Sequence, residues 1–202
     1  MSEPFAAFLK LRIDRPKLVL WLDAPVGPAS QWADWRNMGG QYYGSDGVKE
    51  LRDFSDSEMA EYVTECGARL RRFGDHRSAL RAIMSTAAEP HFKRASYHAD
   101  TREFIAGSFT YGENLTDFIV FYSVVRAVEA LLGDGDDGIA VIHDFVWEQA
   151  TDSAMRLGPG ARSEFMNSTD MSRAGDAFQE IADEMLQDST AGPVIDELDS
   201  LR

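Results

Sequence analysis

The stretch LLGDGDDGIAVIHDFV, residues 131–146, places three aspartates and three glycines between two apolar runs. Its first half could be a cation site, a phosphate loop or a sharp turn. The spacing of apolar residues in its second half indicates whether the C-terminal part of the chain is helical or forms strands. After the glycines, apolar residues and one histidine recur at helical intervals, namely Ile139, Ile142, His143, Val146 and Ala150. We therefore predict that a helix follows the glycines.

The aspartate-rich half fits neither a calcium loop nor a phosphate loop. An EF-hand loop starting at Asp134 needs an oxygen ligand at position 5, glycine at 6 and a carboxylate at 12, but those positions hold glycine, isoleucine and phenylalanine. A phosphate loop needs lysine followed by serine or threonine, and three carboxylates would repel the phosphate. We predict an exposed turn in which Gly133 ends one helix and Asp136 and Asp137 favour the start of the next.

Helical periodicity predicts further helices on both sides of this turn. Ser55 and Glu58 have the spacing of a capping box, and the helix that they start ends at Gly74. A shorter helix is predicted over residues 76–86. Asn114 is the predicted cap of a strongly apolar helix, and a last clear helix begins near Asp170. A short terminal helix is predicted after residue 193.

Two segments have strand composition. Residues 17–23 (KLVLWLD) lie between two prolines, and residues 101–112 end in turn residues. We find no repeat and no long linker. The sequence therefore predicts a single, mainly α-helical globular domain over residues 1–202, with a small β element of two or three short strands near the N-terminal half. Residues 1–54 would be mixed strand and loop, and residues 55–202 a helical body with a strand near 102–111.

The acidic charge is concentrated in the last third of the chain. The formal net charge is −14, and from Glu129 onward 17 acidic residues face four arginines and no lysine. Such a region would repel phosphates and anionic lipids, so we expect neither nucleic acid nor membrane as a partner. No apolar run approaches the roughly 20 residues of a spanning helix, and the N-terminus lacks the basic start of a signal peptide. The sequence thus predicts a cytoplasmic protein.

The acidic helices are the leading candidate for a binding surface. On the helix beginning near Asp170, carboxylates lie opposite the apolar stripe, and like charges four residues apart repel one another. Such a face either keeps a protein soluble or attracts a basic partner. The carboxylates assigned to partner binding are Asp144, Glu148, Asp152, Asp176, Glu180, Asp183 and Glu184.

A second candidate is the aromatic segment at residues 30–47. Its aromatic residues are Trp32, Trp35, Tyr42 and Tyr43, interrupted by two glycines. Aromatic side chains on a glycine-containing loop can anchor an interface, or they can cover a small core. We assign these four residues to partner binding with both interpretations open.

No local motif predicts catalysis, a metal site or a cofactor. His91, His98 and Asp100 are the residues from which a non-local His/Asp site could be assembled near the second strand. The single cysteine, Cys66, rules out an internal disulfide and is interpreted as a core residue of its helix. His143 is expected on the buried stripe of its helix.

Three functions remain open at this point. The leading hypothesis is a non-enzymatic cytosolic protein that occludes a basic partner, the physical character of an acidic bacterial immunity protein or antitoxin that neutralises a toxin. The alternatives are a small enzyme with a non-local His/Asp site and an adaptor or regulatory module that binds proteins. No cofactor and no metal are expected.

Overall fold

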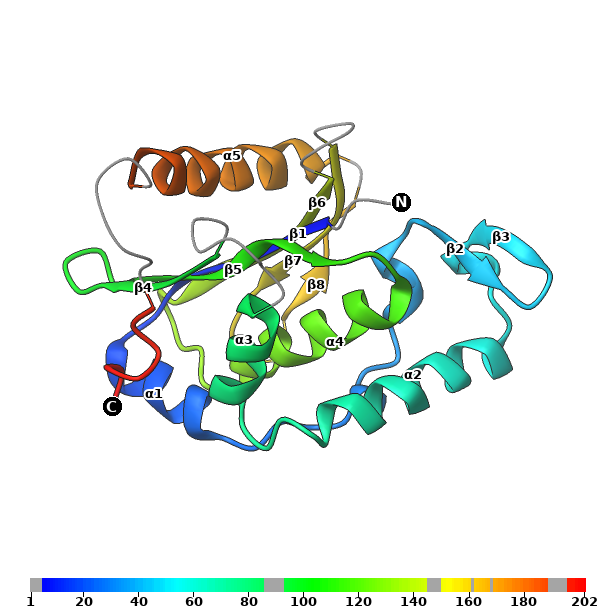
Figure 1. Ribbon diagram of the computed structural model, residues 1–202, viewed down its shortest axis with the longest axis horizontal. Coiled ribbons are helices and arrows are strands. Elements are labelled where there is room, and N and C mark those ends of the chain that lie inside the picture. Colours follow the sequence, from blue (N-terminus) through cyan, green and yellow to red (C-terminus); the bar gives the residue numbers. More distant parts are fainter. Residues whose placement is uncertain (1–4, 86–92, 145–149, 161, 168, 189–195) are drawn as a thin grey trace.

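The computed structural model describes residues 5–85, 93–144, 150–160, 162–167, 169–188 and 196–202. Its centre is a six-stranded antiparallel sheet with the strand order β4-β5-β1-β6-β7-β8 (Figure 1). A separate hairpin is formed by β2 (Gln41–Gly44) and β3 (Gly47–Glu50). The strands of the large sheet are β1 (Phe5–Arg12), β4 (Lys93–His98), β5 (Glu103–Gly112), β6 (Asp137–Asp144), β7 (Ala150–Leu157) and β8 (Glu164–Phe165).

Helices cover both faces of this sheet. On one side lie α1 to α4, and on the other lies α5 (Figure 1). The helices are α1 (Arg15–Asp23), α2 (Asp56–Leu70), α3 (His76–Met84), α4 (Leu115–Arg126) and α5 (Met171–Asp188). Short 3-10 turns are η1 (Ala29–Gln31), η2 (Trp35–Met38), η3 (Leu51–Asp53) and η5 (Ala127–Ala130). Within the described residues, no helix has both the length and the apolar character needed to cross a membrane.

The prediction of a mainly α-helical domain with a few short strands is wrong, because the protein is an α/β fold built on a large sheet. The residues after the aspartate turn form β6, not a helix. Ala140 and Ile142 enter the core under α1–α4, while Val141 enters the core under α5. A central strand with both faces buried is apolar at nearly every position, so its residues also satisfy helical spacing.

The segment predicted as the first strand is helix α1. Pro16 occupies the first turn, where its missing N–H costs nothing. Leu18, Trp21 and Leu22 are buried at helical spacing against the sheet and α3. The first strand, β1, precedes this helix and lies in the middle of the sheet, paired with β5 on one side and β6 on the other.

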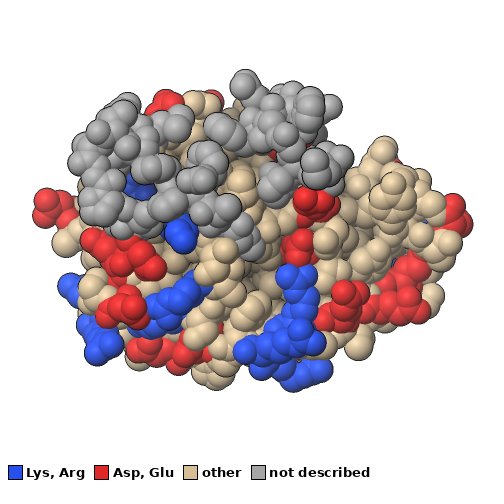
Figure 2. Space-filling view, in the orientation of Figure 1, with Lys and Arg blue, Asp and Glu red and all other residues tan. Residues whose placement is uncertain are grey.

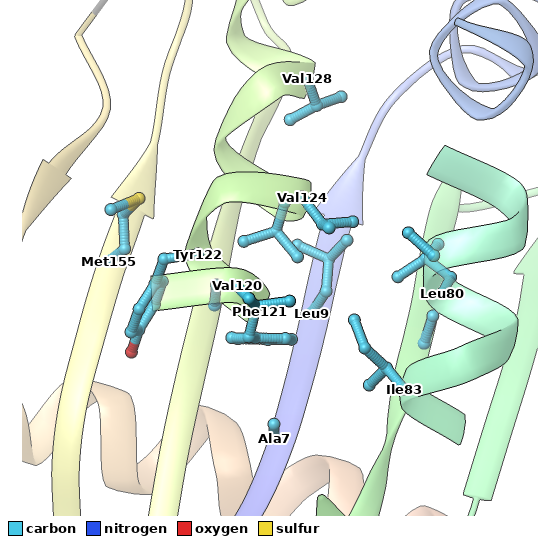
Figure 3. Close-up of a cluster of buried hydrophobic side chains, with 14 of the residues drawn as sticks. Ala7, Leu9, Leu80, Ile83, Val120, Phe121, Tyr122, Val124, Val128 and Met155 are labelled. Atoms are coloured by element: carbon cyan, nitrogen blue, oxygen red, sulfur yellow. The ribbon is translucent and has the colours of Figure 1, made fainter. Parts of the chain in front are cut away.

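The predicted helix starts are confirmed where a side chain caps the backbone. Ser55 and Glu58 form the expected capping box of α2. At α4, the Asn114 side chain accepts a hydrogen bond from the Asp117 N–H at 3.0 Å. The α4 helix is buried nearly all round and fills the larger core with α3 and β1 (Figure 3). Its labelled neighbours there are Ala7, Leu9, Leu80, Ile83 and Met155.

The opposite core lies between the sheet and α5. Phe178, only 2% exposed, stacks on His143 at a centroid distance of 4.0 Å and meets Phe8 and Phe109 edge-on, each at 6.1 Å. His143 is buried as expected, although on a strand. This aromatic cluster fixes α5 on the sheet.

The C-terminal residues cover the outer edge of β4. Asp196 forms a parallel bridge with Ala95, and the Glu197 N–H donates to the Ala95 carbonyl at 2.8 Å. The Glu197 carboxylate accepts from the Tyr97 N–H at 2.7 Å. Leu198 and Leu201 are buried beside them. The terminal helix predicted after residue 193 would begin outside the described residues, and residues 196–202 form turns.

Candidate partner-binding surfaces

The aspartate turn at residues 133–138 is held by its own side chains and by neighbouring cations. The buried Asp136 carboxylate accepts from the Gly133 N–H at 2.9 Å and from the Lys17 ammonium at 2.5 Å. Burial alone would raise the pKa of Asp136, but Lys17, the Gly133 N–H and Arg102 together lower it. A turn is therefore present, but it differs from the prediction, because Asp136 is buried, α4 ends at Arg126 and not at Gly133, and strand β6 follows where a helix was predicted. Asp136 links this turn to α1 through Lys17.

The carboxylates of α5 are partly neutralised by cations from the sheet. Glu180 pairs with Lys10 of β1 at 3.1 Å, and Glu184 pairs with the buried Arg94 of β4 at 2.9 Å. Asp183 accepts a hydrogen bond from Gln179 at 2.7 Å. Glu180 and Glu184 repel each other along the helix, but each pairs with a cation of the sheet. The fold therefore removes part of the negative potential that the sequence predicts.

The other predicted carboxylates are dispersed over β6, β7 and α5, and the structure describes only some of their side chains. Asp144 ends β6 and is half-buried. Glu148 lies outside the described residues, and Asp152 lies on β7 at a position where only the backbone is described. Asp176 is exposed and has no cation within ion-pair distance among the described residues.

The aromatic segment divides between core and surface. Trp35 is 2% exposed, and its indole N–H donates to the Ala29 carbonyl at 3.1 Å. Trp32 is half-buried, donates to Glu129 at 3.3 Å and lies beneath the Arg126 guanidinium. Tyr42 is also half-buried and meets Phe118 edge-on at 5.9 Å. These three residues cover the core, in agreement with the interpretation that the aromatic side chains cover a core and do not anchor an interface.

Tyr43 differs from these three aromatics because it is 76% exposed. It pairs across the β2–β3 hairpin with Val48, which is 55% exposed, so two large apolar side chains meet on one solvent-facing side. Cross-strand neighbours on the same face of a hairpin lie close enough to form a continuous patch. The hairpin projects at one end of the molecule, far from α5 (Figure 1).

Glu58 joins this hairpin to the start of α2. Its carboxylate accepts from the Ser45 N–H, the Ser45 hydroxyl and the Ser55 N–H, each at 2.8 Å, and pairs with Lys49 at 2.9 Å. The Ser45 N–H and the Lys49 ammonium, with the other donors, hold the pKa of Glu58 well below its usual range. The Tyr62 hydroxyl donates to the Tyr43 carbonyl at 2.7 Å and adds a second link.

Carboxylates are frequent in and beside the hairpin. Asp46 lies in its turn and Glu50 on the same face as Val48, while further carboxylates lie on α2, which meets the opposite face of the hairpin through Lys49. Residues 36–65 contain seven acidic and three basic side chains. Figure 2 shows acidic residues along the half of α2 that lies below the hairpin and basic residues toward its other end. We call this region the hairpin surface; it consists of Tyr43, Asp46, Val48, Glu50, Asp53, Asp56 and Glu61.

The residues considered for catalysis do not form a site in the described structure. His98 is exposed near Arg94 and Glu184, Asp100 lies in the exposed turn after it, and His91 falls outside the described residues. Cys66 is fully buried, and burial raises the pKa of its thiol to about 12, which confirms its interpretation as a core residue. Across the described ranges, no group of three or more His, Cys, Asp or Glu side chains could hold a metal ion.

Sequence reasoning identified Tyr43 but missed its partner. The signal for Val48 was the run YYGSDGV, in which two short apolar segments flank a glycine-containing turn typical of a hairpin. No protein-family model matches the chain, and no curated protein or solved structure matches it either. The functional argument therefore rests on the two acidic surfaces themselves.

Proposed function

We propose that the protein is a non-enzymatic cytoplasmic binding protein that occludes a basic protein through the hairpin surface, as an immunity or antitoxin-type inhibitor does. The observation that carries the proposal is the exposed Tyr43–Val48 pair on a projecting hairpin, with Asp46 in its turn and Glu50 on the same face as Val48. An apolar centre within a polar rim is the arrangement of a protein interface, and tyrosine is enriched among the residues that dominate binding energy.

The charge around the apolar pair selects the kind of partner. The three cations of residues 36–65 pair with nearby carboxylates, but the exposed Asp53, Glu61 and Glu65 have no cation within ion-pair distance among the described residues. This excess gives the region a negative potential that attracts a basic protein and speeds encounter. The same potential disfavours nucleic acid and anionic lipid. A basic cleft, such as one that binds a phosphate-containing substrate, would offer complementary charge to a projecting acidic hairpin.

The hairpin is also held in place before it binds. Glu58 connects Ser45, Lys49 and Ser55, and the Tyr62 hydroxyl holds the Tyr43 carbonyl. Ordering a loop on binding costs free energy, so a loop that is already ordered binds more tightly. A rigid projection suits an inhibitor that fills a site, since the partner does not have to fold it.

The test uses the full chain as an affinity bait in extracts of its own source cells. Captured proteins are identified by mass spectrometry, purified and titrated by calorimetry against the wild type and Tyr43→Ala/Val48→Asp. We expect a basic protein whose affinity falls about 30-fold in the double variant, equivalent to roughly 2 kcal/mol. The activity of this protein should be inhibited by the wild type.

Leu20→Asp is the matched control, because Leu20 is an equally exposed apolar residue, 62% exposed, on α1 and away from the hairpin. It should leave affinity unchanged. The proposal is overturned if the captured proteins are not basic, or if their affinity ignores the double variant. Binding without inhibition would indicate that the protein is an adaptor and not an inhibitor.

A further inference from the structure

A cleft of about 640 Å³ opens on the α5 side of the sheet, away from the hairpin surface. It lies where the strand residues facing α5 change from apolar to charged. In β1, Ala6 and Phe8 pack under the helix, whereas Lys10 and Arg12, next on the same face, line the cleft. In β7, Ala154 packs under α5 and Arg156 lines the cleft.

The rest of the cleft is closed by the turn after β7 and by the first turn of α5. Arg162 belongs to this turn, and its Nε donates to the Pro159 carbonyl at 2.8 Å. The turn is anchored from beneath, because the buried Arg126 donates to the Ser163 carbonyl at 2.9 Å. Arg173 enters the cleft from α5.

The carboxylates lining the cleft are already paired. Glu103 lies 3.6 Å from Lys10, Asp137 lies 3.2 Å from Arg12, and Glu164 lies 3.3 Å from Arg156. The fourth, Asp136, pairs with Lys17. These pairs leave the charges of the cleft wall locally balanced.

Arg162 and Arg173 are different, because neither has a carboxylate within ion-pair distance among the described residues. Two guanidinium groups thus remain available for an anion in a protein whose net charge is −14. The other cations that line the cleft, Lys10, Arg12 and Arg156, each have a carboxylate partner, so these two arginines are the groups that an anion would meet.

We propose that this cleft binds a small molecule that carries a phosphate, with the phosphate held by Arg162 and Arg173. Guanidinium groups bind phosphate oxygens through paired hydrogen bonds. Ile139 and Met166 supply an apolar wall for the organic part of the ligand. The volume lies within the range of about 300–1,000 Å³ found for small-molecule sites.

The test is calorimetry at low salt with three probes: adenosine monophosphate, adenosine and inorganic phosphate. We expect the monophosphate to bind with a dissociation constant below about 1 mM, phosphate to bind more weakly, and adenosine not to bind. The double variant Arg162→Gln/Arg173→Gln should weaken monophosphate binding by at least roughly tenfold. Arg162→Lys/Arg173→Lys, which keeps the charge, should lose less.

Arg52→Gln is the control, because this side chain is 76% exposed and lies outside the cleft. It should bind the monophosphate like the wild type, and circular dichroism should show all variants folded. Absence of monophosphate binding, or binding that survives the double glutamine variant, overturns the proposal. Equal affinity for phosphate and the monophosphate overturns the role of the apolar wall. None of these outcomes bears on the hairpin surface.

Discussion

Along α5, Glu180 and Glu184 reach cations of the sheet, whereas the hairpin surface carries an exposed apolar pair beside carboxylates. Both regions are acidic, and α5 belongs to the part of the chain that carries nearly all the net charge. Yet its cations come from β1 and β4, in the near-neutral part. Charge distribution along the chain is therefore a poor guide to charge distribution in space.

The largest expected difference between the two regions concerns their aromatic residues. Phe178→Ala should lower the free energy of unfolding by about 3–5 kcal/mol, because the ring is buried between Phe8, Phe109 and His143. Tyr43→Ala should change it by no more than about 0.5 kcal/mol, since the ring is mostly exposed. Urea denaturation followed by circular dichroism measures both. Similar losses in the two variants would show that the hairpin contributes to the core.

A smaller effect is expected from a carboxylate of α5. Glu184→Gln should cost roughly 1–2 kcal/mol, because it removes a charged acceptor from the buried Arg94 guanidinium. Asp183→Asn, on the same helix and hydrogen-bonded to the exposed Gln179, should stay within about 0.5 kcal/mol. The same denaturation experiment compares them. Equal values would mean that the Arg94 pair adds nothing to the docking of α5.

The hairpin surface should respond locally to loss of its connecting carboxylate. Glu58→Ala removes the acceptor shared by Ser45, Lys49 and Ser55, so the amide protons of β2 and β3 should exchange at least roughly tenfold faster. Glu61→Ala, one turn further along α2 and exposed, should leave exchange unchanged. Hydrogen exchange followed by mass spectrometry gives the rates. Unchanged exchange in Glu58→Ala would show that other contacts hold the hairpin.

The smallest effect expected is a pH dependence of stability to which His143, on the α5 side, contributes. Burial lowers the pKa of His143, although Asp144 opposes this shift. As the pH falls through the unfolded value near 6.5, the unfolded chain takes up a proton that the folded chain refuses, so stability decreases until the folded pKa is reached. His143→Phe should flatten this decrease between about pH 7 and pH 5. Burial also lowers the pKa of His76. His76 therefore leaves part of the pH dependence in the His143→Phe variant, with the same sign.

The predictable parts of the fold are those fixed by local hydrogen bonds. The starts of α2 and α4 could be predicted because Ser55 and Asn114 satisfy N–H groups only three residues away. The strand β6 could not, because its apolar run is explained by helices on both faces of the sheet. The prolines on both sides of residues 17–23 favour strand boundaries in the sequence, although Pro16 is compatible with the first turn of α1.

The candidate site was predictable only in part, because it also depends on contacts between segments that are distant in the sequence. The sequence marks Tyr43 as aromatic but does not distinguish it from Trp35, which is buried by η1 and α2. The exposure of Tyr43 depends on the register of the hairpin and on its attachment through Glu58. The partners of Glu180 and Glu184 lie on strands formed from distant segments, so no local pattern indicates them.

The covering of β4 by residues 196–197 restricts how another chain can attach. An open sheet edge is a template for β-augmentation, in which a partner contributes a strand through main-chain hydrogen bonds. In the described part of the large sheet, one edge is occupied by Asp196 and Glu197, and the opposite edge strand, β8, has two residues. We therefore expect recognition at the large sheet to depend on side chains, so that single substitutions there change partner choice more readily than they would at a strand-exchange interface.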